Sequence, residues 1–374
     1  MKKKHRVLVA MSGGVDSSVT AALLVRRGYD VVGVTMQIWQ ESQTDPRHSG
    51  CCSLGAVEDA RRVARHLGIP YYVINFREEF KEYVIQRFLD SYAAGLTPNP
   101  CIECNRHVKF DLLLQKAEEI GCDKLATGHY ARVRYSHAKQ KWSLLRARAK
   151  EKDQSYALYM LSQEQLSKVI FPLGELPSKA HTRSIARELG LPVADKPDSQ
   201  EICFVSEAGG YANFLKNRRP DAFVEGPMIT SDGKVVGTHR GLGNYTIGQR
   251  KRIGLNLNGK PLYVLRIQPE TNSIVVGSEE ELYCQDVIFE NVVSQENHVP
   301  VRVMGKVRYN MTPMPAILYP GNPMRARFLT PIRAVTPGQT AVFYKGERVV
   351  AGGTILGSEM TGSERMASEK VNLS

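Results

Sequence analysis

Hydrophobic and polar positions in the first half of the chain follow two periods in alternation. Short apolar runs are continuous, as in strands buried on both faces, and the stretches between them have apolar residues at helical spacing. This alternation predicts an α/β fold with a doubly wound parallel sheet, whose ligand binds at the carboxyl ends of the strands. The predicted strands are 6–11, 30–36, 70–76 and 122–133, and the predicted helices are 17–28, 54–68, 78–95 and 108–121.

The pattern changes near residue 210. Beyond it, short β-branched runs are separated by Asn-Gly, Asp-Gly and Pro-Gly turns, which predicts β structure. We predict a catalytic domain over 1–210, a small β-rich central domain over 211–282 and a C-terminal β-barrel over 283–358. Residues 359–374 are polar and aperiodic, so we predict a disordered tail.

Composition narrows the class of protein. No apolar run is long enough to cross a bilayer and the first residues lack the pattern of a signal peptide, so we expect a cytoplasmic protein without a membrane partner. The net charge of +12 suits a polyanionic partner but does not establish one. The 7 cysteines are an odd number in a long chain, which argues against a disulfide framework.

A glycine loop lies between the first predicted strand and helix. The two glycines of Ser12–Ser18 allow close approach to a phosphate, and the start of the helix directs backbone N–H groups toward it. Asp16 would repel a bare phosphate, so it either holds Mg²⁺ or fixes the loop. The spacing matches neither the P-loop nor the dinucleotide fingerprint. A plain turn without a ligand is the alternative.

Cysteines form the second candidate site. Cys101 and Cys104 make a C-x-x-C just before a helix, which is compatible with half of a zinc site, a redox pair, or a nucleophile with a neighbour. No second C-x-x-C supports a structural zinc site. Cys203 follows an acidic, polar stretch. The remaining cysteines are expected to be bystanders, namely Cys51, Cys52, Cys122 and Cys284.

A family resemblance covers the chain from the first strand to about residue 357. The glycine loop resembles the SGGxDS signature of the ATP pyrophosphatase (PP-loop) superfamily. Together with further motifs in order, it resembles the tRNA-specific 2-thiouridylases of the MnmA type. These motifs are N-P-x-x-x-C-N (99–105), ATGHYAR (126–132), KDQSYAL (152–158), DSQEICF (198–204), YTIGQR (245–250) and TPGQTAVFY (336–344).

This resemblance implies an activity and its partners. The family uses ATP with Mg²⁺ to adenylate O2 of the wobble uridine in tRNAs for Lys, Glu and Gln, and replaces that oxygen with sulfur. The implied partners are the tRNA anticodon arm and a sulfur donor, either a cysteine desulfurase or a relay protein.

The resemblance also assigns roles to residues. Cys104 matches the nucleophile, and Cys203 matches the cysteine that carries the persulfide. Cys104 either releases hydrosulfide from this persulfide, leaving a transient disulfide, or helps to transfer the sulfur directly. The implied ATP-binding residues are Ala10, Met11, Ser12, Gly13, Gly14, Val15, Asp16, Ser17, Met36 and Gly128. The implied target-base residues are Asn99, Pro100 and Cys101, and the implied tRNA-binding residues are His129, Lys152, Asp153, Gln154, Arg308, Tyr309 and Gln339.

One position departs from the family pattern. Many members have aspartate where this chain has Cys101. We consider two hypotheses. Either Cys101, Cys104 and Cys203 hold a 4Fe–4S cluster with one open iron that binds the incoming sulfur, or Cys101 is a spare thiol and the persulfide route holds without a metal.

Basic residues in the second half predict contact with RNA. Residues 239–252 place arginine, lysine and histidine around a glycine-rich turn, and further arginines follow in the predicted barrel. We expect the central domain and the barrel to clamp the anticodon arm. The alternatives are a small-metabolite PP-loop ligase, a 2-thiocytidine-forming tRNA enzyme, and a non-enzymatic RNA-binding protein. A small-metabolite ligase would leave the cysteines and basic residues without a role.

Overall fold

A computed structural model describes the chain except for short segments. It covers residues 5–39, 54–198, 202–205, 210–251, 253–254, 256–257, 259–294 and 300–358. The chain divides into two compact units. The first comprises Met1–Arg87, Pro100–Tyr211 and Glu347–Val349, and the second comprises Phe88–Asn99, Ala212–Gly346 and Val350–Ser374.

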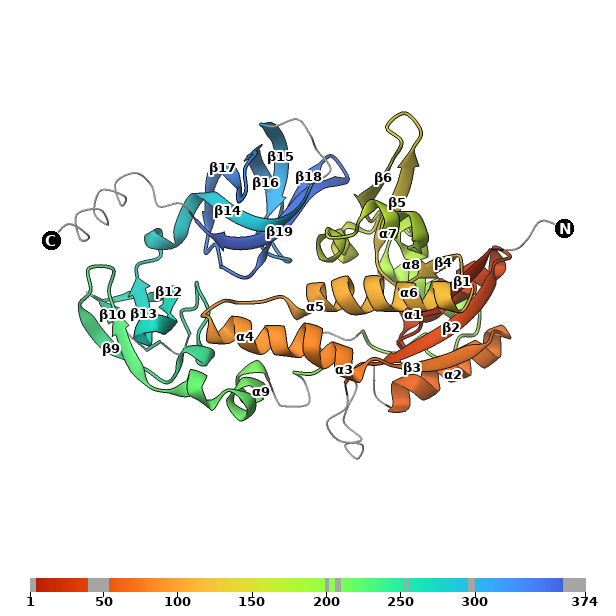
Figure 1. Cartoon of the computed structure of the whole chain (residues 1–374), viewed down its shortest axis with the longest axis horizontal. Coiled ribbons are helices and arrows are strands. Elements are labelled where there is room, and N and C mark those ends of the chain that lie inside the picture. Colours follow the sequence, from red (N-terminus) through yellow and green to blue (C-terminus); the bar gives the residue numbers. More distant parts are fainter. Residues whose placement is uncertain are drawn as a thin grey trace. The chain divides into compact units, whose positions relative to one another are not determined.

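A parallel sheet forms the centre of the first unit (Figure 1). Its strand order is β3-β2-β1-β4-β7, and every pairing is parallel. The central strand β1 is fully buried at Val7, Leu8 and Val9, as its continuous apolar pattern predicts. The predicted α/β fold class is therefore confirmed. The strands are β1 (Arg6–Ala10), β2 (Asp30–Gln37), β3 (Tyr71–Asn75), β4 (Lys124–Ala126) and β7 (Val169–Ile170).

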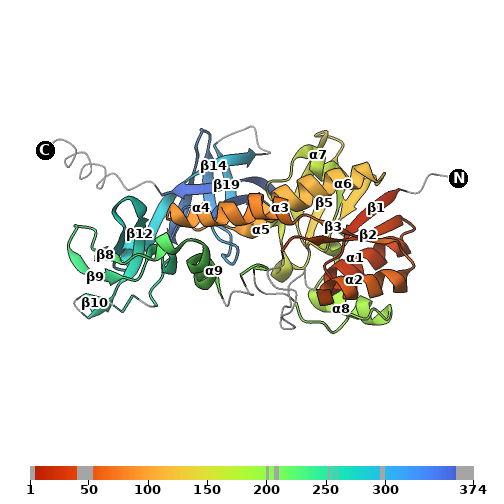
Figure 2. The ribbon, with the colours of Figure 1, turned by 60° about the horizontal axis from the view of Figure 1, so that its bottom comes forward.

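Helices cover both faces of this sheet. Figure 2 shows α1, α2 and α8 together on one side and α6 on the other. Apolar residues of the first group share one buried core with β1, including Val19, Ala60 and Ile185. Helices and helical turns of this unit are α1 (Val15–Arg26), α2 (Leu54–Leu67), α3 (Arg77–Phe80), η1 (Lys81–Gln86), α5 (Pro100–Glu103), η2 (Cys104–Leu112), α6 (Leu113–Glu119), η3 (Lys150–Lys152), η4 (Ser155–Leu158), α7 (Gln163–Lys168), η5 (Pro172–Glu175) and α8 (Lys179–Glu188).

The predicted strand 122–133 is two strands in the structure. It is interrupted at Thr127–Tyr130, after which β5 (Ala131–Ser136) pairs antiparallel with β6 (Lys141–Arg146). The cause is a close approach to the glycine loop: a side chain at Gly128 would place its Cβ only 2.9 Å from the backbone nitrogen of Ser17. At the break, this segment therefore lies against the start of α1.

The second unit is rich in β structure. A four-stranded sheet has the order β12-β13-β8-β9, and six antiparallel strands close into a barrel through the pairing of β14 with β19. Phe289, Phe328 and Phe343 fill the barrel core. The elements of the second unit are α4 (Arg87–Ala93), α9 (Tyr211–Arg218), η6 (Pro220–Phe223), β8 (Gly226–Ile229), β9 (Val235–His239), η7 (Leu242–Asn244), β10 (Asn256–Leu257), β11 (Lys260–Pro261), β12 (Tyr263–Gln268), η8 (Pro269–Thr271), β13 (Ser273–Gly277), η9 (Glu280–Leu282), β14 (Tyr283–Ser294), β15 (Val301–Lys306), β16 (Met314–Tyr319), β17 (Met324–Arg333), β18 (Thr340–Lys345) and β19 (Arg348–Gly357).

Some predictions concern residues outside the described segments, and others stay open. The predicted disordered tail, 359–374, lies outside the described residues, as do Cys51 and Cys52. The domain boundaries at 210 and 282 stay predictions. In the part of the chain that the structure describes, no helix is long and apolar enough to cross a membrane.

Candidate active site

The glycine loop connects β1 to α1, as the sequence predicts. Gly14 is the residue before the helix and has no side chain to cap it, so the first backbone N–H groups of α1 have no side-chain cap. The hydroxyls of Ser17 and Ser18 both donate to the carbonyl oxygen of Gly14, at 3.1 and 2.8 Å. The Ser17 hydroxyl also accepts from the backbone N–H of Ser12 at 3.1 Å. These bonds shape the loop so that its helix end can receive an anion.

Two features outside the loop hold its backbone in place. Gly13 has a φ of +68°, and a Cβ there would lie 2.2 Å from the carbonyl oxygen of Ala56, so only glycine fits. The ammonium of Lys196 donates to the carbonyl oxygen of Gly13 at 3.1 Å and to Asp59 at 2.7 Å. The conformation of the loop is thus set by residues distant in sequence.

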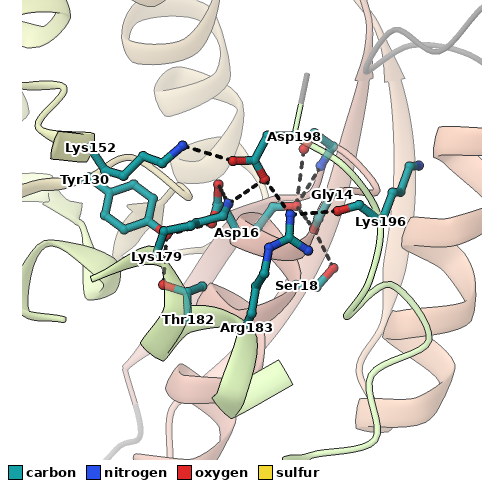
Figure 3. Close-up of polar contacts among 12 residues, drawn as sticks. Gly14, Asp16, Ser18, Tyr130, Lys152, Lys179, Thr182, Arg183, Lys196 and Asp198 are labelled. Atoms are coloured by element: carbon teal, nitrogen blue, oxygen red, sulfur yellow. Dashed lines mark hydrogen bonds and ion pairs between the residues drawn. The ribbon is translucent and has the colours of Figure 1, made fainter. Parts of the chain in front are cut away.

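A network of charged side chains surrounds Asp16 (Figure 3). Lys179 Nζ lies 2.7 Å from both carboxylate oxygens of Asp16 and 2.8 Å from Asp198 Oδ1. Asp198 also pairs with Arg183 at 3.0 Å and Lys152 at 3.1 Å. Although burial alone would raise the pKa of Asp198, hydrogen bonds from Lys179 and Lys152 hold it below its usual value. Asp198 is therefore ionised at neutral pH.

The hydroxyl of Tyr130 completes this network. It donates to Asp16 at 2.8 Å and lies 2.8 Å from the hydroxyl of Thr182. Burial, with the nearby Asp16 carboxylate, raises the pKa of Tyr130 far above its usual value, so the phenol stays protonated and acts as a donor.

A cavity of about 380 Å³ lies in the first unit beside the glycine loop. Residues from β1, β2, α1, α5, η2 and the segment around Cys203 line it, so elements far apart in the sequence meet there. Among the predicted site residues, the lining includes Ala10, Met11, Ser12, Asp16, Ser17, Met36, Pro100, Cys101, Cys104, Gly128, His129, Gln154 and Cys203.

All three candidate cysteines line this cavity. Cys101 is exposed, Cys104 is buried and Cys203 is half-buried. The residue after Cys203 is fixed by aromatic packing, because the ring of Phe204 lies 5.9 Å from the ring of Phe80 and 6.3 Å from that of Trp39. The structure therefore places Cys203 on the cavity that holds Cys104.

Two polar side chains complete the cavity wall near the cysteines. His129 Nδ1 lies 2.7 Å from the hydroxyl of Thr127, and its ring contacts those of Phe110 and Phe171, which also contact each other. Burial, together with the charge of Lys109, lowers the pKa of His129 well below its usual value, so the ring is neutral at pH 7. Lys109 also lines the cavity and donates to Asn105 at 2.9 Å.

The segment 152–154 has three different environments. Asp153 is almost buried and accepts hydrogen bonds from Arg146 at 2.9 Å and from the backbone of Ala147 at 3.0 Å. Gln154 lines the cavity and accepts from the backbone N–H of Tyr130 at 2.9 Å. Lys152 pairs with Asp198, as described above. Their predicted contacts with tRNA stay predictions.

The other predicted RNA-contacting residues belong to the second unit. Arg308 donates to the carbonyl oxygen of Arg333 at 3.0 Å, and Tyr309 is exposed beneath the ammonium of Lys306. Gln339 donates to the carbonyl oxygen of Thr97 at 2.8 Å. Asn99, a predicted target-base residue, is also assigned to this unit and does not line the cavity.

The structure adds residues that sequence reasoning missed. Lys179, Arg183 and Lys196 surround the loop, although no motif pointed to them. Asp198 lies within a quoted motif but received no role. Among the described residues, no group of three His, Cys, Asp or Glu side chains is arranged to hold a metal ion.

Comparison with known proteins identifies related chains of nearly equal length. The chain is 50% identical over 362 residues to the tRNA-specific 2-thiouridylase MnmA of Desulforamulus reducens, covering 95% of this chain and 98% of that protein. It is 48% identical to the protein of the same name from Acetivibrio thermocellus, covering 94% and 99%. A solved 4-thiouridine synthetase in complex with RNA and bound ATP is 20% identical, with a TM-score of 0.35, and covers 54% of this chain and 45% of its own.

Three family models match consecutive parts of the chain. They are described as a tRNA methyl transferase HUP domain over 5–207, a tRNA methyl transferase PRC-barrel domain over 212–278 and an aminomethyltransferase beta-barrel domain over 280–355. The relatives that are nearly half identical over the same length are named for thiolation, not methylation. The chain therefore belongs to the family of tRNA-specific 2-thiouridylases, and it is an enzyme.

Proposed function

We propose that this enzyme uses Mg-ATP to replace O2 of the wobble uridine of tRNA with sulfur, giving 2-thiouridine in tRNAs for Lys, Glu and Gln. The observation that carries the proposal is a single cavity lined by both the glycine loop and the cysteines Cys104 and Cys203. A loop alone fits any ATP-dependent ligase. A loop and two cysteines on one cavity suit activation of an oxygen followed by its exchange for sulfur.

The first chemical step activates the base. O2 of uridine attacks the α-phosphorus of ATP, so pyrophosphate leaves and C2 carries an adenylate. The loop and the start of α1 direct N–H groups toward the phosphates. Asp16 either helps to hold Mg²⁺ or keeps the loop in shape. The resulting AMP is a far better leaving group than oxide, which makes C2 open to a sulfur nucleophile.

The second step delivers the sulfur. A donor protein, either a cysteine desulfurase or a relay protein, loads Cys203 as a persulfide. The Cys104 thiolate attacks Sγ of Cys203, which releases hydrosulfide and leaves a Cys104–Cys203 disulfide. Hydrosulfide then adds to C2 and AMP departs. A dithiol reductant must supply two electrons to reset the pair. In the direct alternative, the terminal sulfur attacks C2 while it is still bound to Cys203, and AMP departs. The Cys104 thiolate then attacks Sγ of Cys203, which breaks the bond to the transferred sulfur, frees 2-thiouridine and leaves the same disulfide.

The cavity also suits a base taken out of its stack. An anticodon base must be turned outward to reach a half-enclosed site. Pro100 and Cys101, two of the three predicted target-base residues, line this cavity together with Gln154 and neutral His129. We propose that these side chains bind the uracil, and that Arg308, Tyr309 and Gln339 of the second unit contact the anticodon arm. We further propose that the protein acts in the cytoplasm.

Nucleoside mass spectrometry tests the proposal. Unmodified tRNA is incubated with the protein, Mg-ATP, cysteine, a desulfurase and a dithiol reductant. The expected product is 2-thiouridine, absent when ATP is omitted. Cys104→Ala and Cys203→Ala should give no product, and Cys122→Ala, a change at a buried cysteine that does not line the cavity, should keep full activity.

Other outcomes distinguish the alternatives. A 2-thiocytidine product assigns the enzyme to the related tRNA activity. If an active donor gives no modified nucleoside while the protein consumes ATP with a small carboxylate or amine, the small-metabolite ligase is favoured.

The additional thiol at Cys101 supports a second, narrower proposal. Cys101, Cys104 and Cys203 line the same cavity and would be the three ligands of a 4Fe–4S cluster, but in the structure they do not form a group arranged to hold a metal ion. The open iron of such a cluster would bind the incoming sulfur. Anaerobic purification with iron and sulfide analysis tests this, with Cys101→Ser as the matched variant. A colourless protein without iron excludes the cluster and leaves Cys101 as a spare thiol.

A further inference from the structure

Lys179 is a largely buried lysine that pairs with two carboxylates. It is the first residue of α8, and its side chain is only 12% exposed. Its Nζ lies within 2.8 Å of three carboxylate oxygens, two from Asp16 and one from Asp198. Figure 3 shows the ammonium between the two acids. All three N–H bonds of the ammonium thus have an acceptor.

This position is next to the glycine loop. Asp16 is the second residue of α1 and lines the cavity with Ser12 and Ser17. A nucleotide whose phosphates approach the start of α1 therefore meets the Asp16 carboxylate, which repels it. In the structure that carboxylate is neutralised by Lys179. Among the described residues, no other Lys or Arg forms an ion pair with Asp16.

Two of the neighbouring cations, Arg183 and Lys196, hold backbone carbonyl oxygens, and a third, Lys152, pairs with Asp198 but not with Asp16. Arg183 donates to the carbonyl oxygens of Ala194 and Lys196 as well as to Asp198. Lys196 is bonded to Asp59 and to the carbonyl oxygen of Gly13. Moving either of these side chains would break contacts that shape the backbone. The hydrogen bonds of Lys179 go to carboxylate oxygens, which phosphate oxygens can replace, and its ammonium also lies 5.9 Å from the centre of the Tyr130 ring.

We propose that Lys179 is a binding residue for the polyphosphate of ATP, and that it exchanges carboxylate contacts for oxygens of the β- and γ-phosphates when the nucleotide enters. The proposal rests on the proposed use of ATP. Asp198 competes with the nucleotide for the ammonium, and Asp16 becomes available to Mg²⁺ as Lys179 moves away from it. Lys179 then compensates the charge of the departing pyrophosphate.

Binding measurements with variants test the exchange. Lys179→Gln should weaken ATP binding roughly ten- to a hundredfold, because a charge-assisted contact is lost, and should weaken AMP binding far less. Lys179→Arg should recover part of the loss. Lys168→Gln is the matched control, because Lys168 also bridges two carboxylates, those of Glu118 and Glu164, but neither of these lines the cavity as Asp16 does.

Asp198→Asn should have the opposite effect. Removing the competing carboxylate frees Lys179 and adds positive charge, so ATP binding should tighten by roughly two- to tenfold. A merely structural network predicts weaker binding for both variants. Weaker or unchanged ATP affinity in a folded Asp198→Asn protein would therefore overturn the exchange, as would a Lys179→Gln protein that loses ATP and AMP affinity equally.

A label on the wild-type protein makes the test independent of variants that fold poorly. An adenosine polyphosphate ending in pyridoxal forms an imine with a lysine near the terminal phosphate, and borohydride reduction fixes it. Peptide mapping should find the label on Lys179, and excess ATP should prevent it. A label found only on Lys152, Lys196 or Lys109 contradicts the proposal.

Failure of the proposed function and failure of the proposed role of Lys179 give different results. If the wild-type protein does not bind ATP, the proposed function itself is wrong. If the wild-type protein binds ATP and Lys179→Gln binds it equally well, only the role of Lys179 is wrong.

Discussion

The ring of Phe204 packs edge-on against the ring of Phe80, with centroids 5.9 Å apart, and so fixes the backbone next to Cys203. Phe204 is 1% exposed and lines the same cavity as the thiol that it adjoins. Sulfur transfer requires two sulfur atoms to approach each other at a defined distance and angle. Small displacements of a reacting group lower the reaction rate strongly. The position of Cys203 therefore depends on a residue that carries no reactive group.

Replacing this aromatic contact should slow sulfur transfer without weakening ATP binding. In Phe204→Leu we expect 2-thiouridine formation to fall at least about tenfold, because Cys203 is held less closely, whereas ATP binding stays near that of the wild type. Rates of thiolation and the dissociation constant for ATP provide the measurement. Phe289→Leu in the barrel core is the control for lost aromatic packing. An equal loss of rate in both variants would indicate general destabilisation.

Gly128 is predicted to be indispensable for the glycine loop. In Gly128→Ala the new Cβ would lie 2.9 Å from the backbone nitrogen of Ser17, and backbone atoms cannot move aside cheaply. We expect ATP affinity to fall about tenfold or more, since such crowding costs about 1–3 kcal/mol. Isothermal titration calorimetry measures the affinity for ATP. Gly357→Ala, which would meet nothing within 4 Å, is the control. Unchanged ATP affinity in Gly128→Ala would contradict the close approach.

Charge reversal in the second unit should separate RNA binding from nucleotide binding. Arg250 lies with Lys251 and Arg333 around one pocket, and Arg308 contacts the backbone of Arg333. We expect the double variant Arg250→Glu and Arg308→Glu to bind tRNA at least about tenfold more weakly, with a smaller salt dependence, while ATP binding is unchanged. Filter binding over a salt series measures both effects. Arg26→Glu in the first unit is the control. If tRNA affinity does not change, these residues do not contact the RNA.

The lowered pKa of His129, a partly buried residue on the cavity wall, predicts how the stability of the fold depends on pH. Burial lowers the pKa of His129, so the unfolded chain binds a proton at a higher pH than the folded one. Stability should therefore fall as the pH drops below about 6.5, by at most about 1.4 kcal/mol per pH unit for this group. His107 and His239, whose pKa values burial also lowers, act in the same direction.

A variant isolates the contribution of His129. Between pH 7 and pH 5, His129→Gln should lose less unfolding free energy than the wild type, and His181→Gln, an exposed control, should follow the wild type. Urea unfolding at each pH provides the values. A steeper loss in His129→Gln than in the wild type would show that the ring is not held neutral.

Much of the first unit could be predicted because its signals are local. The continuous apolar run 6–11 and the helical spacing of 17–28 depend on neighbours within a few residues, and both elements form within two residues of the predicted bounds at Arg6–Ala10 and Val15–Arg26. The glycine loop between them follows from the same short stretch. The strand 122–133 was predicted too long, because its interruption is caused by packing against a loop more than a hundred residues earlier.

The order of motifs in the sequence was sufficient to predict the family, and the local pattern was sufficient for the β1–loop–α1 unit. Only the tertiary structure decided which charged residues surround that unit. Lys179 and Asp16 are separated by 163 positions, and no periodicity, cap or turn signal links them. The same is true of Cys203, whose place on the cavity of Cys104 depends on aromatic contacts between distant segments. Sequence patterns record interactions between near neighbours, whereas this site is assembled by chain segments that meet only when the core is packed.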